Sequence, residues 1–261
     1  MLLDRPPKLE KPGLFVTGTD TEVGKTLVTC AIAAALRRQQ PGWRVGVSKP
    51  FASDCRRERE GLVNADAEAL AHFADCRLPL DVINPIRFAP PLAPAVAAEQ
   101  TGDTPDWAEL RRSLETLDES SDCLLIEGVG GLLVPLDPER PKVTVLEFAR
   151  ELGYPVLVVA RSVLGTLNHT AMTVRLLKQA GLRVAGIVMN GYDADVAAAE
   201  DPSIATNRRW LAKMTGVKVL AVVPRVPAER AHPEKGQLPG DILDAVAMAD
   251  WAAAMRVPPR K

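Results

Sequence analysis

The chain has 261 residues and a formal net charge of −1, with 47% apolar and 25% charged residues. These values are typical of globular proteins and allow one large α/β domain or two small ones. The near-zero net charge gives no electrostatic support for binding nucleic acid or a membrane surface, and no apolar run is long enough to cross a bilayer. The four cysteines are scattered without a C-x-x-C pair, and the N-terminus lacks a continuous apolar stretch. We therefore expect no disulfide framework, no secretory signal and a cytoplasmic location.

Short apolar runs alternate with longer helical patterns along the whole chain. Strands are predicted at 14–18, 44–48, 122–127, 155–160, 183–189 and 217–223, and helices near 25–38, 64–75, 106–117, 143–152, 166–180, 204–215 and 240–255. Near-continuous apolar strands fit a parallel sheet that is covered on both faces. We predict a single doubly wound α/β domain over residues 13–256, with a mainly parallel sheet, helices on both faces and ligands beyond the carboxyl ends of the strands.

The remaining segments are predicted to lie outside this alternation. Residues 1–12 and 257–261 are expected to be a flexible N-terminal extension and a flexible C-terminal tail. Residues 191–203 and 227–239 are expected to be surface loops. The proline-rich segment 77–104 has apolar residues between its prolines, which indicates a fixed excursion from the sheet instead of disorder.

The first predicted strand is followed by residues 18–26, Gly-Thr-Asp-Thr-Glu-Val-Gly-Lys-Thr, and then by the first predicted helix. N–H groups at a helix start have no intrahelical partner, and the helix dipole favours an anion there. Lys25 adds a cation for the β- and γ-phosphates, and the Thr26 hydroxyl is placed to bind Mg²⁺. Five residues instead of the usual four separate Gly18 from Gly24. Because a strand and a helix flank the motif, it predicts a nucleotide-binding P-loop, and a plain glycine turn would not explain the Lys-Thr pair.

Polar residues also follow the later strands, at the sheet edge where the P-loop is expected. Lys49 could offset charge that develops during phosphoryl transfer, although a solvent-exposed lysine would look the same. Glu127, followed by Gly-Val-Gly-Gly, ends its strand as a Mg²⁺ anchor would, and the alternative is a glycine-rich turn. Asp66 is either a metal ligand or an acid that complements a helix dipole. Asn190 either reads a base edge or caps a turn.

Several motif blocks occur in an order that resembles the dethiobiotin synthetase family. The resemblance covers residues 13–226 and rests on 16–26, Lys49-Pro50 with Ser53, Asn64-Ala65-Asp66-Ala67, Asn84-Pro85, 127–131, Leu164-Gly165 with Asn168-His169, and Asn190. It implies a P-loop-type α/β fold with a seven-stranded, mainly parallel sheet, and a homodimer. It also implies an ATP-dependent ligase that joins CO₂ to 7,8-diaminononanoate and closes the ureido ring of dethiobiotin, the penultimate step of biotin biosynthesis. The implied steps are carbamate formation, phosphorylation of the carbamate by ATP, and attack by the second amine.

The resemblance assigns roles to individual residues by their position in these motifs. Lys25 and Lys49 are the implied catalytic residues, and Mg²⁺ is implied at Thr26, Asp66 and Glu127. The implied ATP contacts are Thr21, Glu22, Val23, Gly24, Lys25, Thr26, Asp66, Glu127, Gly128, Val129, Gly130, Asn190, Pro224, Arg225 and Val226. The implied contacts to the diamine substrate are Thr21, Ser53, Gly165, Leu167 and Asn168. The charged stretch 54–60 departs from this pattern and has no assigned role.

Other classes of protein fit the sequence less well. A partition-type ATPase would carry a lysine early in the P-loop, where this chain has Asp20, Thr21 and Glu22. A non-catalytic sensor domain would not need Lys49, Asp66 and Glu127 together. A glutamine-dependent amidotransferase would need a cysteine with a catalytic partner, and none is evident. The three histidines lack metal-site spacing and no G-x-S-x-G occurs, so zinc and serine-hydrolase chemistry have no support.

Overall fold

A computed structural model of the chain describes residues 7–59 and 61–256. The predicted tail at 257–261 and the first half of the predicted extension at 1–12 lie outside the described residues. Within the described part of the extension, the backbone N–H groups of Glu10 and Lys11 donate to the carboxylate of Asp118 at 3.0 and 2.9 Å. No helix of the described residues is both long and apolar enough to span a bilayer.

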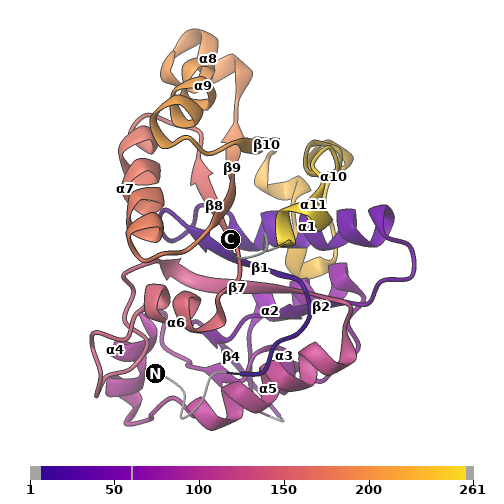
Figure 1. Cartoon of the computed structure of the whole chain (residues 1–261), viewed down its shortest axis with the longest axis vertical. Helices are drawn as coiled ribbons and strands as arrows, with labels where there is room; N and C mark the ends of the chain where they lie inside the picture. Colours follow the sequence, from indigo (N-terminus) through magenta and orange to yellow (C-terminus); the bar gives the residue numbers. More distant parts are fainter. Residues whose placement is uncertain (1–6, 60, 257–261) are drawn as a thin grey trace.

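A six-stranded sheet with the order β10-β9-β8-β1-β7-β2 forms the centre of the fold, and every neighbouring pair is parallel (Figure 1). Its strands match the six predicted ones in position. They are β1 (Gly13–Gly18), β2 (Val45–Ser48), β7 (Cys123–Gly131), β8 (Val156–Arg161), β9 (Val184–Tyr192) and β10 (Val219–Pro224). Because β1 lies between β7 and β8, the P-loop that follows it opens at the middle of the sheet's carboxyl edge.

Helices cover both faces of this sheet, as predicted. The alternation of strand side chains places Leu14 and Val16 in one apolar core and Phe15 in the other. The first core is closed by α1 (Lys25–Gln39), α2 (Ala65–Ala74), α10 (Gly240–Ala247) and α11 (Trp251–Met255). The second is closed by α4 (Pro94–Thr101), α5 (Trp107–Ser120), α6 (Val145–Leu152), α7 (Thr166–Gln179) and α9 (Ser203–Thr215). Figure 1 shows α7 on one side of the sheet, with α1, α10 and α11 on the other.

The central sheet has six strands in the described chain, where the family resemblance implies seven. The chain that leaves β2 passes through Lys49 and Pro50 before it forms β3 (Phe51–Ala52). Proline has no N–H to donate to a ladder, so the strand is interrupted there. The short strand β6 (Ile86–Arg87) pairs in parallel with β3 and not with β2, and forms a separate two-stranded sheet.

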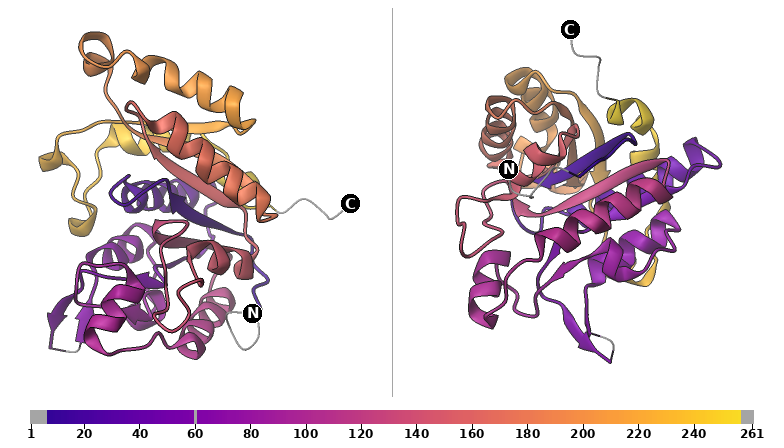
Figure 2. Two further views of the ribbon diagram at one scale, coloured as in Figure 1. Left: turned by 90° about the vertical axis from the view of Figure 1, so that its left-hand side faces the viewer. Right: turned by 60° about the horizontal axis from the view of Figure 1, so that its bottom comes forward.

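The proline-rich excursion is ordered, as predicted, and contains α3 (Leu80–Ile83), β6 and α4. A hairpin of β4 (Arg56–Glu58) and β5 (Gly61–Val63) precedes it and projects from the body of the molecule (Figure 2). The segment 191–203, predicted to be a loop, contains a short helix, α8 (Ala194–Ala199). The side chain of Asp193 caps this helix by accepting hydrogen bonds from its first N–H groups. The predicted helix at 240–255 is divided into α10 and α11, and the side chain of Asp250 caps α11. The predicted loop at 227–239 contains only two short 3₁₀ turns, at Ala228–Arg230 and Pro233–Lys235.

Candidate functional site

The turn between β1 and α1 has the backbone of an anion cradle. Glu22 and Gly24 both adopt left-handed conformations, with φ of 56° and 88°. Turns of this kind bring successive N–H groups together on the concave side, at the start of a helix whose dipole adds positive potential. Only glycine fits at position 24, because a Cβ there would lie 2.0 Å from Nδ2 of Asn190. That amide donates to the carbonyl of Val23 at 3.0 Å and so ties the P-loop to the end of β9.

The first residue of α1, Lys25, is buried and turns back over this cradle. Its Nζ donates to the backbone carbonyl of Asp20 at 3.0 Å, and within the described residues it has no ion pair. Burial lowers the pKa of Lys25 to about 8, and the nearby carboxylate of Glu127 offsets only part of that effect. A buried ammonium with a single neutral partner gains substantially from a bound anion, which suits the phosphate-binding role expected of this lysine.

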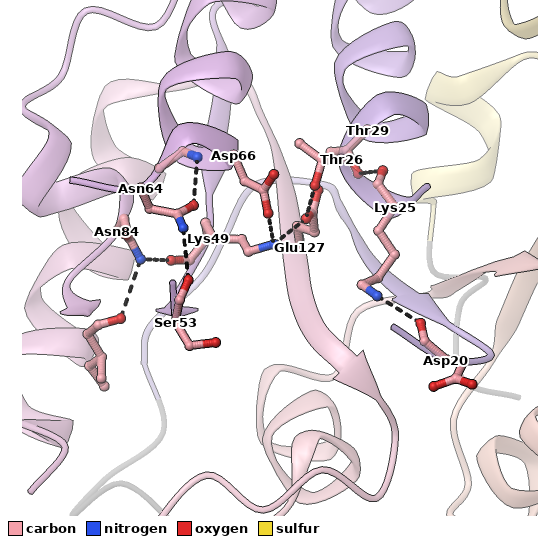
Figure 3. Close-up of polar contacts among 12 residues, drawn as sticks. Asp20, Lys25, Thr26, Thr29, Lys49, Ser53, Asn64, Asp66, Asn84 and Glu127 are labelled. Carbon is pink, nitrogen blue, oxygen red and sulfur yellow. Dashed lines mark hydrogen bonds and ion pairs between the residues drawn. The ribbon is translucent and has the colours of Figure 1, made fainter. Parts of the chain in front are cut away.

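Four predicted site residues from four different elements meet in one polar cluster (Figure 3). Nζ of Lys49, at the end of β2, lies 2.6 Å from Oε1 of Glu127 on β7 and 2.8 Å from Oδ2 of Asp66 on α2. The hydroxyl of Thr26 on α1 donates to the same Oε1 at 2.8 Å. Lys49 is only 5% exposed, which excludes the exposed-lysine alternative. Glu127 is completely buried, and the glycines after it continue β7 to Gly131 instead of forming a simple turn.

Electrostatics fix the charges in this cluster. Burial alone would lower the pKa of Lys49, but the carboxylates of Glu127 and Asp66 outweigh it and hold that pKa above its usual value. Burial alone would raise the pKa of Asp66, and the ammonium of Lys49 outweighs it, so the pKa of this carboxyl is lowered. Lys49 is therefore an ammonium and Asp66 a carboxylate around neutral pH.

The cluster also has the donor set that a hard divalent cation prefers. Glu127 Oε2 is buried and has no hydrogen-bond partner in the described part of the chain. A buried carboxylate oxygen without a partner is costly unless a ligand satisfies it. The Thr26 hydroxyl and the Asp66 carboxylate are the adjacent oxygens, and oxygen ligands of this type suit Mg²⁺. The described residues form no group of three His, Cys, Asp or Glu side chains that could hold a metal ion.

A cavity of about 340 Å³ opens beside the cluster. The lining combines the P-loop, the end of β2, the start of α2 and the end of β7. Ten predicted residues line it: Thr21, Glu22, Gly24, Lys25, Thr26, Lys49, Ser53, Asp66, Val129 and Gly130. Two other predicted residues, Val23 and Gly128, lie beneath that surface, and a Cβ at position 128 would come within 3.0 Å of the ring of Phe15.

Sequence reasoning assigned no role to three polar residues that shape this site. Asp54 lines the cavity beside Ser53. Asn64 also lines it, caps α2 and donates from Nδ2 to the Ser53 carbonyl at 3.2 Å. Asn84 donates to the carbonyl of Lys49 and fixes the backbone of that lysine (Figure 3). Asn64 and Asn84 both belong to the motif blocks of the family, and their presence in these blocks could have indicated a role at the site.

The other predicted contacts lie outside the cavity lining. Gly165, Leu167 and Asn168 form the turn into α7, where Gly165 is left-handed and no side chain caps the first N–H groups. Pro224 ends β10, and Arg225 and Val226 follow it. The N–H of Arg225 donates to the carbonyl of Tyr192, which places this segment beside the end of β9 and Asn190. Because β8 and β10 both lie on the same side of β1, the two groups of residues lie at the carboxyl edge of the sheet, on one side of the P-loop.

Solved structures with a similar fold include MinD cell division proteins. A chain of the MinC:MinD cell division protein complex of Aquifex aeolicus matches with a TM-score of 0.58 and 13% identity, over 96% of this chain and 99% of that one. MinD of Pyrococcus horikoshii, solved with Mg-ADP, matches with a TM-score of 0.53 and 18% identity, over 92% of this chain and 94% of that one. At these identities the likeness shows the fold alone.

Sequence comparison gives a closer relationship. A family model described as an AAA domain matches residues 12–232. The ATP-dependent dethiobiotin synthetase BioD of Anaeromyxobacter sp. (strain K) is 43% identical over 84% of this chain and 94% of that protein. The enzymes of the same name from Thermodesulfovibrio yellowstonii and Bacillus subtilis (strain 168) are 38% and 36% identical, each over 82% of this chain. The chain belongs to the dethiobiotin synthetase family.

Proposed function

We propose that this protein is an ATP-dependent dethiobiotin synthetase, which forms the ureido ring of dethiobiotin from 7,8-diaminononanoate and CO₂. Membership of the family supports the reaction. The observation that carries the assignment to this chain is the cluster of Lys49, Asp66 and Glu127, which lies against Thr26 of the P-loop and beside one cavity. A catalytic ammonium, two carboxylates and an anion cradle are the groups that phosphoryl transfer to a carbamate requires.

The metal and phosphate sites follow from the donor atoms. Mg²⁺ would be held by the Thr26 hydroxyl and by the carboxylates of Asp66 and Glu127, and when bound it neutralises charge on the phosphate oxygens. The buried Oε2 of Glu127 without a hydrogen-bond partner supports this proposal. Lys25 and the N–H groups of residues 21–26 bind the phosphates of ATP. The segment Gly128, Val129 and Gly130, at the end of β7, has little side-chain bulk and allows its backbone to approach the nucleotide closely.

The chemistry then proceeds in three balanced steps. One neutral amine of the diamine attacks CO₂, forms a C–N bond and loses a proton, which gives a carbamate. A carbamate oxygen attacks the γ-phosphorus and ADP leaves, while Lys25 and Lys49 stabilise the negative charge of the transferred group. The second amine attacks the carbonyl of this mixed anhydride, phosphate leaves, a proton is lost and the ring closes. Because the second amine is in the same molecule, its effective concentration is high.

The remaining assignments concern the two ends of the ligands. Thr21 and Ser53 are proposed to contact the amine and carbamate end of the substrate, because both line the cavity. The uncapped first N–H groups of α7, at Gly165, Leu167 and Asn168, are proposed to bind the substrate carboxylate. Adenine is proposed to lie against Asn190 and the segment Pro224, Arg225 and Val226.

We also propose that the enzyme is a homodimer that works in the cytoplasm. The turn into α7 exposes two large apolar side chains, Val163 and Leu164, with exposed fractions of 43% and 78%, and Met172 on α7 is 55% exposed. Apolar side chains gathered beside a ligand-binding turn suit a contact with a second copy. The four cysteines are all free thiols, which suits a reducing compartment. Sedimentation of the wild type and of Leu164→Asp tests the dimer: we expect the wild type to be dimeric and the variant to be monomeric.

One experiment tests the function directly. The purified protein is incubated with the diamine, bicarbonate, Mg²⁺ and one of four nucleoside triphosphates, and the cyclic urea is detected by mass. We expect the product with ATP, and none with Lys49→Ala under the same conditions. If the wild type hydrolyses ATP but forms no cyclic urea, or if Lys49→Ala closes the ring at the wild-type rate, the proposed function is wrong.

A further inference from the structure

Three residues other than glycine have a left-handed backbone in the described chain: Glu22, Asp54 and Asp75. Asp75 is the C-cap of α2, a position where this conformation is common. Glu22 belongs to the P-loop. Asp54 has a φ of 57°, lies in neither a helix cap nor the P-loop, and lines the same cavity as Lys49 and Ser53.

The segment around Asp54 is held in place from both sides. The N–H of Asp54 donates to the carbonyl of Pro90 at 3.2 Å, and the next N–H, of Cys55, donates to Phe88 at 3.1 Å. On the other side the carbonyl of Ser53 accepts from Nδ2 of Asn64. These bonds over-determine a backbone conformation that is disfavoured for a residue with a Cβ, and such conformations persist mainly where the surroundings enforce them.

The Asp54 carboxylate differs from the other acids of the site in what it contacts. Asp66 and Glu127 are both bound by the ammonium of Lys49. The described part of the chain contains no ion pair or side-chain hydrogen bond to Asp54, although this acid lines a cavity that holds two lysines. Its negative charge therefore remains available to a cationic ligand that enters the cavity.

We propose that the Asp54 carboxylate recognises the diamine substrate, by accepting hydrogen bonds from its cationic amine next to Ser53. This inference rests on the proposed function, which supplies the substrate. A vicinal diamine carries one proton near neutral pH, because two adjacent ammonium groups repel each other. One amine is then neutral and can attack CO₂, while the other is an ammonium that a carboxylate can hold.

The position of Asp54 also explains why it acts on the diamine and not on the nucleotide. The oxygens that suit Mg²⁺ are those of Thr26, Asp66 and Glu127, which contact one another or share Lys49. Asp54 lies on the segment after β3, and within the described residues no hydrogen bond or ion pair joins it to any of them. A carboxylate there would repel the phosphates of ATP but attract the ammonium of the other substrate, so it separates the two ligands within one cavity.

Two variants and a matched control test the proposal. Asp54→Asn removes the charge and keeps a side chain that tolerates the left-handed conformation, whereas Asp54→Gly removes the side chain and relaxes the backbone. Asp75→Asn, at the other left-handed aspartate, is the control because it lies outside the cavity. The rate of cyclic urea formation is measured at varied diamine, ATP and Mg²⁺ concentrations, together with the midpoint of thermal unfolding.

We expect both Asp54 variants to raise the KM for the diamine about tenfold, the value of one charge-assisted hydrogen bond. The KM for ATP and the Mg²⁺ dependence should stay within about twofold, Asp54→Gly should not lower the unfolding midpoint, and Asp75→Asn should behave as the wild type. An unchanged KM for the diamine overturns the proposal, as does an equal rise in the KM for ATP or an equal effect of Asp75→Asn. A wild type that forms no cyclic urea overturns the proposed function, and with it this assignment, whereas a failure confined to the variants overturns only the role of Asp54.

Discussion

Replacing Lys49 by methionine should destabilise the protein before any substrate is bound. Lys49→Met leaves the fully buried carboxylate of Glu127 without the ammonium that lies 2.6 Å away. Removing one partner of a buried ion pair costs roughly 3–5 kcal/mol, because the remaining charge is uncompensated. The contact with Asp66 adds little, since that side chain is 44% exposed and screened by water. At about 3 kcal/mol, the midpoint of thermal unfolding of a chain this long should fall by about 6–12 °C.

The assay is thermal unfolding of the wild type and the variants, monitored by circular dichroism. It is run without nucleotide, once with Mg²⁺ and once without. Lys8→Met is the matched control, because it breaks an exposed ion pair with Glu10 and should change little. Adding Glu127→Gln to Lys49→Met should recover part of the loss, since the buried charge is then absent. Mg²⁺ should stabilise Lys49→Met more than the wild type, because the metal replaces the missing cation. An unfolding midpoint within 2 °C of the wild type's, roughly 1 kcal/mol or less, or equal stabilisation of both proteins by Mg²⁺, would refute this reasoning.

Three further outcomes are expected. Asp66→Asn should raise the Mg²⁺ concentration for half-maximal turnover about tenfold, the effect of one lost charge-assisted contact, and an unchanged titration would remove Asp66 from the metal site. Asn190→Ala should raise the KM for ATP and reduce discrimination among nucleoside triphosphates. The KM is measured for all four triphosphates, and an unchanged preference in the variant would show that Asn190 does not bind the base. Burial would raise the pKa of Asp137, but hydrogen bonds from Arg140 and Trp107 lower it below the unfolded value. Asp137 therefore contributes stability above about pH 4 that is lost as the pH falls, so the unfolding midpoints of Asp137→Asn and wild type should converge between pH 7 and pH 3, and a constant gap would contradict this.

The sheet could be predicted from the sequence because its strands are apolar on both faces. Each of the six runs is long enough to be recognised without its neighbours, and the alternation with helices implies parallel order. The shorter elements depend on single residues that a periodic pattern does not weigh. Asp193 creates α8, Asp250 separates α11 from α10, and Pro50 detaches β3 from β2. Such local effects decide the ends and interruptions of elements more than their existence.

The sequence predicted which residues come together at the site, but it did not predict the contacts that each of them makes. Strand ends and motif blocks indicated Lys49, Asp66 and Glu127 as neighbours of the P-loop. The sequence left open whether Asp66 binds a metal or complements a helix dipole, and the structure places it in the first turn of α2 and also on Lys49. Neither interpretation of Asn190 anticipated its bond to the Val23 carbonyl. Contacts of this kind depend on side-chain direction across separate elements, which spacing along the chain does not encode.

The cluster couples the position of Lys49 to the proposed metal site. Lys49 is bound to the two carboxylates that are proposed to hold Mg²⁺, so metal and ammonium compete for the same oxygens. A divalent cation held by Glu127 and Asp66 would weaken the attraction of these carboxylates for the ammonium, which could then pair with a phosphoryl group in the cavity. Without a cation, Lys49 pairs with the two carboxylates. With one bound, the ammonium would be available to stabilise the charge of the transferred phosphoryl group. This coupling needs a compact cation in a buried position, so arginine, which is bulkier and planar, should not substitute for lysine there.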